Sequence, residues 1–329
     1  MHDTIKIAVI DSNITANYLC DLISIKDYLM FRQRRKNDVF LNEIEIQRVN
    51  NIKKAKRVSH GTMVVNTVYK YAQNVPLEFY IYDVFDENDE SSGIVLVEAL
   101  RMILETEIDI IVMSLTCSRT YEDDFNKLKE KIKEKNVVLI CSAANDGIMK
   151  FPANLEFVYG VTGDKVNVCG KYRYDVNEEL QFWSDIQGEF VGEPGKYSFF
   201  CGTSKATAVV AGRLANYMFK NGKEALIDYL AINHDEFDDS IIKSESNSVN
   251  EELLVEFCKT FKLSENVCIE NMDVLIPWNV NNIRSFEMFM TKIGLKNEII
   301  TLNYSEFATV HKIMKSCERR INDVSMDAV

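Results

Sequence analysis

The chain lacks long apolar runs, paired cysteine motifs and an excess of basic residues. No stretch approaches the about 18 consecutive apolar residues of a membrane-spanning helix, so no membrane segment or membrane partner is predicted. The eight cysteines are scattered, without C-x-x-C pairs or interleaved histidines, so neither a zinc site nor a redox motif is indicated. We predict no metal and no cofactor. The formal net charge of −12 argues against nucleic-acid binding.

The composition is typical of a globular protein. The 329 residues are 47% hydrophobic, which is enough for one large core and a smaller unit. The chain reaches an apolar strand-like segment within its first few residues, which leaves no room for a secretory signal. We therefore expect a cytoplasmic protein without disulfides.

The first two thirds of the chain alternate between strand-like and helix-like segments. Apolar, β-branched segments predict central strands of a parallel sheet over residues 5–11, 77–84, 108–114, 137–142 and 156–162. Helices are predicted over residues 60–72, 93–105, 121–135 and 203–220. This alternation predicts the α/β class, with a doubly wound, mainly parallel sheet flanked by helices.

Three polar residues stand at the ends of these segments. Asp11 closes the first strand, His60 lies in Ser-His-Gly-Thr at the start of the first helix, and Ser204 lies in Gly-Thr-Ser-Lys-Ala-Thr at the start of the last. Each alone is more often a structural cap than a catalytic group. In open α/β sheets, however, ligand-binding residues gather at the carboxyl ends of strands and in the turns that follow. Their joint occurrence therefore indicates a catalytic site.

The segments around these residues resemble those of subtilisin-like serine proteases, in the chain order Asp, His, Ser. The segment Ser-Ala-Ala-Asn-Asp-Gly at 142–147 resembles the oxyanion-hole segment of that family. The resemblance spans about residues 6–220 and implies the subtilisin-like fold. It implies that Ser204 is the nucleophile, His60 the general base, Asp11 the group that orients the imidazole, and Asn145 a donor to the oxyanion.

The same resemblance implies a substrate-binding wall. It consists of Ser114, Leu115, Thr116, Ser142, Ala143 and Ala144. Because Thr116 and Ala144 replace glycines that are usual in the family, we expect a narrow pocket that favours small or medium side chains. The chain also departs from the family directly after Ser204, where Lys205 brings a cation next to the nucleophile in sequence.

A basic region precedes His60 in sequence and consists of Arg-Gln-Arg-Arg-Lys at residues 32–36 and Lys-Lys-Ala-Lys-Arg at residues 53–57. Such a run is most often a solvated face. The alternative is that it helps to hold an acidic peptide.

Beyond about residue 222 the alternation of strands and helices gives way to an acidic, serine-rich segment and then to short helix-like segments. We divide the chain into a protease domain at 1–232, an acidic, serine-rich linker at 233–250 and a helical domain at 251–329. Within the last of these, apolar residues at helical spacing predict helices over 251–261, 283–293 and 307–320.

This layout resembles an acyl-carrier-protein bundle. In that family the second helix opens with Asp-Ser-Leu, whose serine carries phosphopantetheine. The matching positions here are Asn281, Asn282 and Ile283, so the attachment serine is absent. The resemblance implies a carrier-like domain that recruits a partner, and the alternative is a helical extension that only stabilises the protease.

A subtilase joined to a carrier-like domain resembles the processing proteases of bacterial peptide-maturation systems. We expect a serine endopeptidase that removes the leader from a ribosomally made, modified precursor peptide. The helical domain would dock the precursor or a peptide-modifying enzyme. Two alternatives are a general intracellular protease and a catalytically silent protease fold that serves as a binding or scaffold protein.

Overall fold

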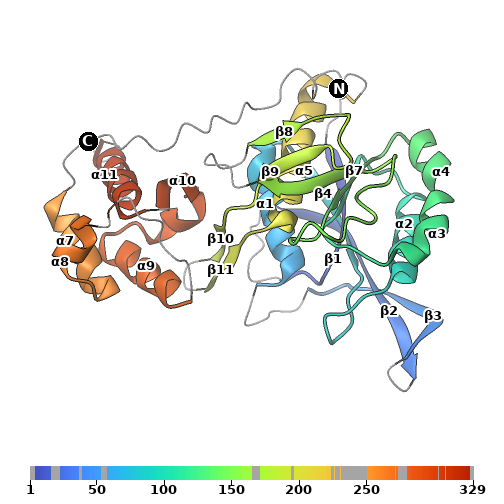
Figure 1. Ribbon diagram of the computed structural model, residues 1–329, viewed down its shortest axis with the longest axis horizontal. Helices are drawn as coiled ribbons and strands as arrows, with labels where there is room; N and C mark the ends of the chain where they lie inside the picture. Colours follow the sequence, from blue (N-terminus) through green and yellow to red (C-terminus); the bar gives the residue numbers. More distant parts are fainter. Residues whose placement is uncertain are drawn as a thin grey trace.

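The computed structural model describes residues 4–15, 23–36, 39–52, 58–164, 171–193, 196–223, 250–270, 280–302, 304–307 and 309–326, together with residues 226, 230 and 272. Figure 1 shows a sheet domain with helices on both of its faces and a separate group of helices from the C-terminal part of the chain. The predicted linker at 233–250 lies outside the described residues except for Asn250.

The sheet has nine strands in the order β3-β2-β4-β1-β5-β6-β7-β9-β8. Strands β2 to β9 along this order are paired in parallel, and the outermost pairs β2–β3 and β8–β9 are antiparallel. The predicted mainly parallel α/β sheet is confirmed. Its strands are β1 (Ile5–Asp11), β2 (Ser24–Lys36), β3 (Val39–Arg48), β4 (Leu77–Asp83), β5 (Ile110–Met113), β6 (Val138–Ser142), β7 (Tyr159–Asp164), β8 (Tyr172–Tyr174) and β9 (Phe182–Asp185).

Two hydrophobic layers enclose this sheet because successive side chains of a strand point to opposite faces. On β1, Ile7 and Val9 join the layer formed with helices α1 (His60–Ala72) and α5 (Thr203–Asn221). Ala8 and Ile10 join the opposite layer, which includes side chains of helix α2 (Gly93–Ile103). The central strands β1, β5 and β6 are thus buried on both faces, as their continuous apolar sequences predict.

The helix predicted over 121–135 is wrong as a single element. The structure has a short 3₁₀ turn at Arg119–Tyr121, helix α3 (Glu122–Asn126) and helix α4 (Lys129–Glu134). Between the helices, the Leu128 amide donates to the Phe125 carbonyl at 2.9 Å, a tightened turn that brings both side chains into the core.

Helices α1 and α5 pack unusually close together. A Cβ atom on Gly212 of α5 would lie 2.5 Å from the Val68 carbonyl oxygen and 2.8 Å from the Tyr71 Cβ, both on α1. Asn216 adds a hydrogen bond from its Nδ2 to the Ala72 carbonyl at 2.9 Å. Any larger side chain than glycine at 212 would separate the two helices that begin at His60 and Thr203.

A two-stranded hairpin, β10 (Glu189–Glu193) and β11 (Lys196–Phe200), lies between the sheet domain and the C-terminal helices (Figure 1). The C-terminal helices share one core, which contains Phe257, Phe286, Phe289 and Phe307 and also Phe190 from the hairpin. These elements are α7 (Glu251–Phe261), α8 (Glu265–Glu270), α9 (Val280–Lys292), the 3₁₀ helix η3 (Lys296–Thr301), α10 (Tyr304–Phe307) and α11 (Val310–Met326).

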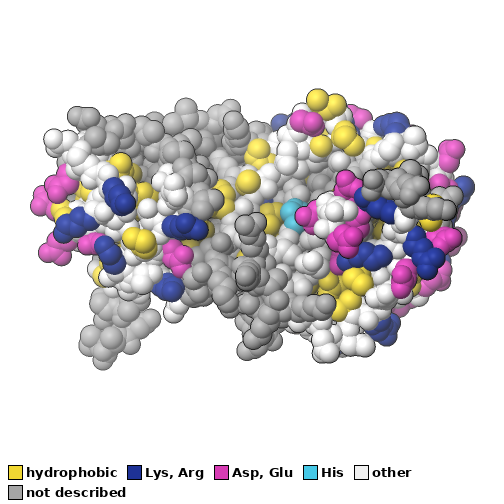
Figure 2. All heavy atoms as spheres, turned by 90° about the horizontal axis from the view of Figure 1, so that it is seen from below, with side chains coloured by type: hydrophobic (Ala, Val, Ile, Leu, Met, Phe, Trp, Pro, Cys, Tyr) yellow, Lys and Arg dark blue, Asp and Glu magenta, His cyan; other side chains and the backbone are white. Residues whose placement is uncertain are grey.

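Acidic and basic side chains are interspersed on the face of the molecule shown in Figure 2, over both the sheet domain and the C-terminal helices. Within the described ranges, no helix is long and apolar enough to cross a membrane. The same residues contain no group of three or more His, Cys, Asp or Glu side chains that could hold a metal ion.

Candidate active site

Asp11 and His60 meet at the carboxyl end of β1. Asp11 is the last residue of that strand and is 1% exposed, while His60 is the first residue of α1. The His60 Nδ1 lies 2.7 Å from the Asp11 Oδ1, which also accepts a hydrogen bond of 2.7 Å from the Ser12 amide. A carboxylate oxygen can only accept, so Nδ1 carries a proton, and in the neutral imidazole Nε2 therefore has the lone pair.

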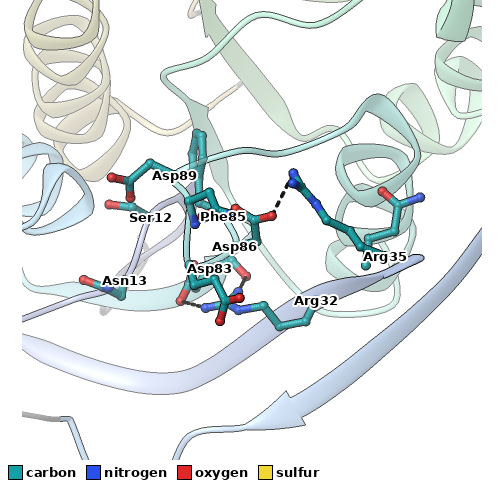
Figure 3. Close-up of a pocket in the computed structure, with 11 residues that line it drawn as sticks. Ser12, Asn13, Arg32, Arg35, Asp83, Phe85, Asp86 and Asp89 are labelled. Carbon is teal, nitrogen blue, oxygen red and sulfur yellow. Dashed lines mark hydrogen bonds and ion pairs between the residues drawn. The ribbon is translucent and has the colours of Figure 1, made fainter. Parts of the chain in front are cut away.

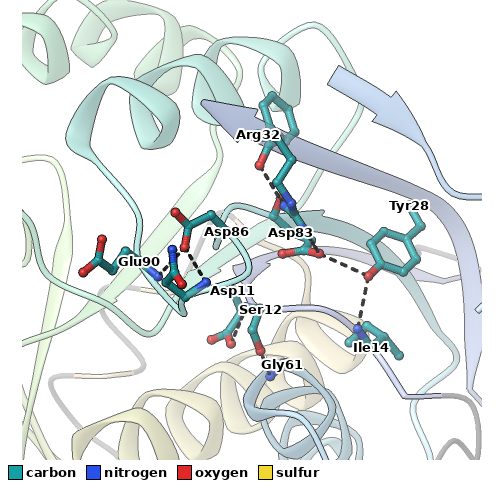
Figure 4. A network of polar contacts seen from close by, with 11 residues as sticks. Asp11, Ser12, Ile14, Tyr28, Arg32, Gly61, Asp83, Asp86 and Glu90 are labelled. Carbon is teal, nitrogen blue, oxygen red and sulfur yellow. Dashed lines mark hydrogen bonds and ion pairs between the residues drawn. The ribbon is translucent and has the colours of Figure 1, made fainter. Parts of the chain in front are cut away.

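The turn after β1 is tied to the start of α1, as Figure 4 shows for Ser12 and Gly61. The Gly61 amide donates to the Ser12 Oγ at 3.0 Å, and the Thr15 amide donates to the Thr62 Oγ1 at 2.8 Å. Ser59 caps the helix, because its side chain accepts from the Thr62 amide. These bonds fix the His60 ring relative to Asp11.

The pKa of His60 is raised above its usual value of 6.5. Burial is the largest single influence and lowers the pKa, because it disfavours the imidazolium. The charge of Asp11 and the hydrogen bond to it act in the opposite direction and together outweigh burial. The site therefore stabilises an imidazolium ion while keeping 39% of the His60 side chain exposed.

Ser204 is the second residue of α5. Its Oγ donates to the Ser114 carbonyl oxygen at 3.4 Å, so the hydroxyl lies at the carboxyl end of β5, the strand next to β1. Among the described contacts this is the only hydrogen bond of the Ser204 hydroxyl, and none joins it to His60. In structures without substrate, the hydrogen bond between a serine nucleophile and its histidine base is often long or poorly aligned.

Asn145 is anchored to the segment that carries Ser204. Its Oδ1 accepts hydrogen bonds from the Thr203 amide at 2.8 Å and from the Thr203 Oγ1 at 3.1 Å. Because an amide N–H can only donate, this contact orients the side chain, and its NH₂ group points elsewhere. Gly202 permits the approach, since it has φ of +84° and a Cβ there would lie 2.5 Å from the Asn145 Oδ1.

A cleft of about 450 Å³ lies over Asp11 and His60. Of the six predicted substrate-binding residues, only Ser114 lines it, and the Ser114 Oγ is buried without a hydrogen-bond partner in the described part of the chain. Leu115, Thr116 and Ala144 are half-buried, while Ser142 and Ala143 are buried. The cleft is lined by Asp11, Ser12, Asn13, Val58, Ser59, His60, Phe85, Asp89 and Ser114.

A second, polar cavity of about 600 Å³ adjoins this cleft and shares Ser12, Asn13, Phe85 and Asp89 with it (Figure 3). Strand β2 contributes Arg32 and Arg35 to its wall. Arg32 is ion-paired with Asp83 at 2.7 Å, and Arg35 is ion-paired with Asp86 at 2.9 Å. Arg34 is ion-paired with Glu43 at 3.0 Å, so the three arginines of segment 32–36 are all bound to acidic groups of the protein. Segment 53–57 of the predicted basic region lies outside the described residues.

Asp83 stands directly beside Asp11, because the two are partners in the β1–β4 register. Burial raises the pKa of Asp83, against the opposing effect of Arg32. The Tyr28 hydroxyl also donates to Asp83 at 3.5 Å (Figure 4), and burial raises the pKa of Tyr28 to about 12. Arg32 thus compensates the negative charge of Asp83, the second buried carboxylate next to Asp11.

Sequence reasoning missed several residues that surround the site. The Phe200 ring packs edge-on against the His60 ring, with 5.5 Å between centroids. Phe85 and Asp89 of the loop after β4 line the cleft. The acidic composition of residues 86–90 was the available signal for the loop, whereas no local pattern around Phe200 indicates a contact with residue 60.

Residues 2–253 match the Subtilase family. The chain belongs to this family. Among solved structures, it resembles a mutant of the epidermin leader peptide processing serine protease EpiP from Staphylococcus aureus, with a TM-score of 0.51, 18% identity, and coverage of 73% of this chain and 72% of that chain. No curated protein matches the chain.

Two further solved structures show weaker similarity to this subtilase. The prenylagaramide maturation protease PagA has a TM-score of 0.48 and 20% identity, with 69% of this chain and 82% of that chain covered. Sphericase has a TM-score of 0.48 and 16% identity, with 69% and 83% covered.

Replacing Asp11 by asparagine will lower the pKa of His60. The substitution removes the charge that favours the imidazolium, while the burial that disfavours it remains, so the pKa falls. An NMR titration of the His60 ring measures the change, and His311, in the C-terminal helices, serves as internal control. An unchanged His60 titration would contradict the assignment of Asp11 as its main partner.

Proposed function

We propose that this subtilase is a serine endopeptidase, with Ser204 as nucleophile, His60 as general base and Asp11 as the group that orients the imidazole. The observation that carries the proposal is the 2.7 Å contact between His60 Nδ1 and Asp11 Oδ1. It leaves Nε2 as the proton acceptor, and Ser204 lies on the helix that packs against α1. A serine hydroxyl needs such a base near neutral pH.

In the proposed reaction the Ser204 Oγ attacks the peptide carbonyl carbon while Nε2 of His60 takes the hydroxyl proton. The imidazolium then protonates the leaving amine, and a water molecule hydrolyses the resulting ester through the same base. Asp11 stabilises the imidazolium in both steps. Because His60 must be neutral to act as base and its pKa is raised, the rate rises with pH through that pKa.

The oxyanion of each tetrahedral intermediate is assigned to the Asn145 side chain and the Ser204 amide. The Asn145 Oδ1 is held by Thr203, and this leaves the NH₂ group as the donor. The Ser204 amide lies at the N-terminus of a 19-residue helix, where partial positive charge favours an anion.

We further propose that the substrate is a precursor peptide and that the cut removes its leader. Support comes from EpiP, which is described as processing the epidermin leader peptide. The C-terminal helices would act as a carrier-like docking domain without the prosthetic group. Helix α9 begins at Val280, so the aligned Asn281 and Asn282 fall in its first turn, where the carrier family has its attachment serine.

Incubation with a fluorophosphonate will place one adduct on the native protein and none on Ser204→Ala. The reagent requires an activated serine, so intact-protein mass spectrometry tests the chemistry without knowledge of the substrate. Candidate precursors are then added to both proteins. A single cut at the leader boundary supports maturation, digestion of unrelated unfolded proteins with uncut precursors indicates a general protease, and a folded protein without adduct indicates a silent fold.

Asn145→Asp will lower the rate of acylation by roughly 100- to 1,000-fold. Aspartate keeps the oxygen that accepts from Thr203 but replaces the NH₂ donor by an acceptor, so the oxyanion loses a partner while the anchor remains. Asp146→Asn is the matched control, because it makes the opposite exchange at the next residue and keeps the Oδ1 that accepts from Ile148. Equal rates for both variants would refute the role of Asn145.

Cleavage will be restricted to bonds that follow small or medium side chains. Thr116 and Ala144 are half-buried in the proposed substrate-binding wall, where glycine would leave more room. Ala144→Gly removes one carbon atom and should raise cleavage after larger residues by roughly 10-fold, and Thr116→Gly, which removes three heavy atoms, should raise it by at least as much. A peptide library analysed by mass spectrometry measures this, and efficient cleavage after Trp or Arg by the native protein would contradict it.

A further inference from the structure

Glu189, the first residue of β10, connects the two helices that carry His60 and Ser204. Its carboxylate is 2% exposed and lies 2.8 Å from Lys70 Nζ on α1 and 3.1 Å from Lys205 Nζ on α5. The Tyr71 hydroxyl of α1 also donates to it. One buried side chain of the hairpin thus holds both helices at the same time.

Lys205 completes this cluster of buried charges directly after the candidate nucleophile. It is fully buried and ion-paired with Asp185, with 2.6 Å between Nζ and Oδ2. Lys205, Asp185 and Glu189 are almost completely buried, so the loss of any one of them takes a partner from a charge in the interior. The cation that the sequence brings next to Ser204 is therefore engaged with the hairpin and with the end of β9.

The hairpin has two faces with different neighbours, as alternation along a strand requires. Glu189 is paired with Phe200, and this face packs on the sheet domain, where Phe200 contacts His60. Phe190 is paired with Phe199, and their rings contact the C-terminal helices. The ring centroid of Phe190 lies 5.4 Å from that of Phe286 and 5.1 Å from that of Phe307.

We propose that hairpin β10–β11 couples the docking of the C-terminal helices to the geometry of the active site, with Glu189 and Phe200 as positioning residues. The inference rests on the proposed role of His60 and Ser204. The contacts that carry it are made by the hairpin within the protein and do not involve the substrate. Adjacent residues on each strand face opposite neighbours, so a shift of Phe190 moves Glu189 and a shift of Phe199 moves Phe200. A peptide or enzyme bound to the C-terminal helices can change the reaction rate through this connection.

The test compares two truncations in the same helical core. Phe307→Ala removes one of the rings that contact Phe190, whereas Phe257→Ala removes a ring whose neighbours are Phe261 and Phe289 of helices α7 and α9. Both side chains are almost completely buried, so both substitutions destabilise the helical core. Two readouts are measured on the full-length chain: hydrogen exchange of segments 58–64 and 198–206, and the kinetics of fluorophosphonate labelling.

Phe307→Ala is expected to speed exchange in both segments and to lower the maximal labelling rate by about 10- to 100-fold, with an unchanged concentration for half-maximal labelling. Phe257→Ala is expected to leave both readouts at native values. Glu189→Gln, which keeps the shape but removes the charge, should reproduce the effect of Phe307→Ala while the C-terminal helices stay folded.

Three results would each refute one idea: the coupling through the hairpin, the positioning role of the hairpin residues, or the proposed protease activity. If both truncations change exchange at 58–64 and 198–206 equally, or neither does, the coupling through the hairpin is refuted and the helices only stabilise the protein. If Phe307→Ala alone changes exchange and its labelling rate equals that of the native protein, the positioning role is refuted. If the folded native protein is not labelled at all, the proposed protease activity fails, and the exchange data still decide the coupling.

Discussion

The close contact between helices α1 and α5 is the constraint on which the candidate site depends. Gly212 lets α5 approach the backbone of α1 at Val68, and the first turns of these helices carry His60 and Ser204. The sheet supplies the third group, because β1 ends at Asp11 under the start of α1. Cores are packed too densely for such a contact to relax freely, so a small change between the helices is passed on to their ends.

Much of this arrangement could be predicted from the sequence, because its signals are local. Strand β1 and helix α1 have the predicted bounds, since continuous apolar runs mark buried parallel strands and Ser59 marks a helix start. The meeting of Asp11 with His60 follows from the order of strands and helices. The family assignment from three short segments is confirmed, whereas the roles of the individual residues stay predictions.

Elements stabilised by distant partners could not be predicted in this way. Strand β2 is rich in charge, and it is paired with β3 and β4, where Arg32 meets Asp83 at the end of β4 and Arg35 meets Asp86 just beyond it. The helix predicted over 121–135 fails because burial of Phe125 and Leu128 favours a tightened turn over a continuous helix. Hairpin β10–β11 has the same origin, since its strands are held by contacts with α1, α5 and the C-terminal helices.

The buried charges around Glu189 are better explained by geometry than by stability. Taking Lys205, Asp185 and Glu189 out of water costs several kcal/mol for each ion, and apolar side chains of similar volume often give equal or greater stability. Apolar contacts, however, are non-directional, whereas an ion pair at 2.6 Å specifies where each partner lies. A catalytic site needs its nucleophile and base held within a fraction of an ångström. Directional contacts provide that precision even where they add nothing to the stability of the fold.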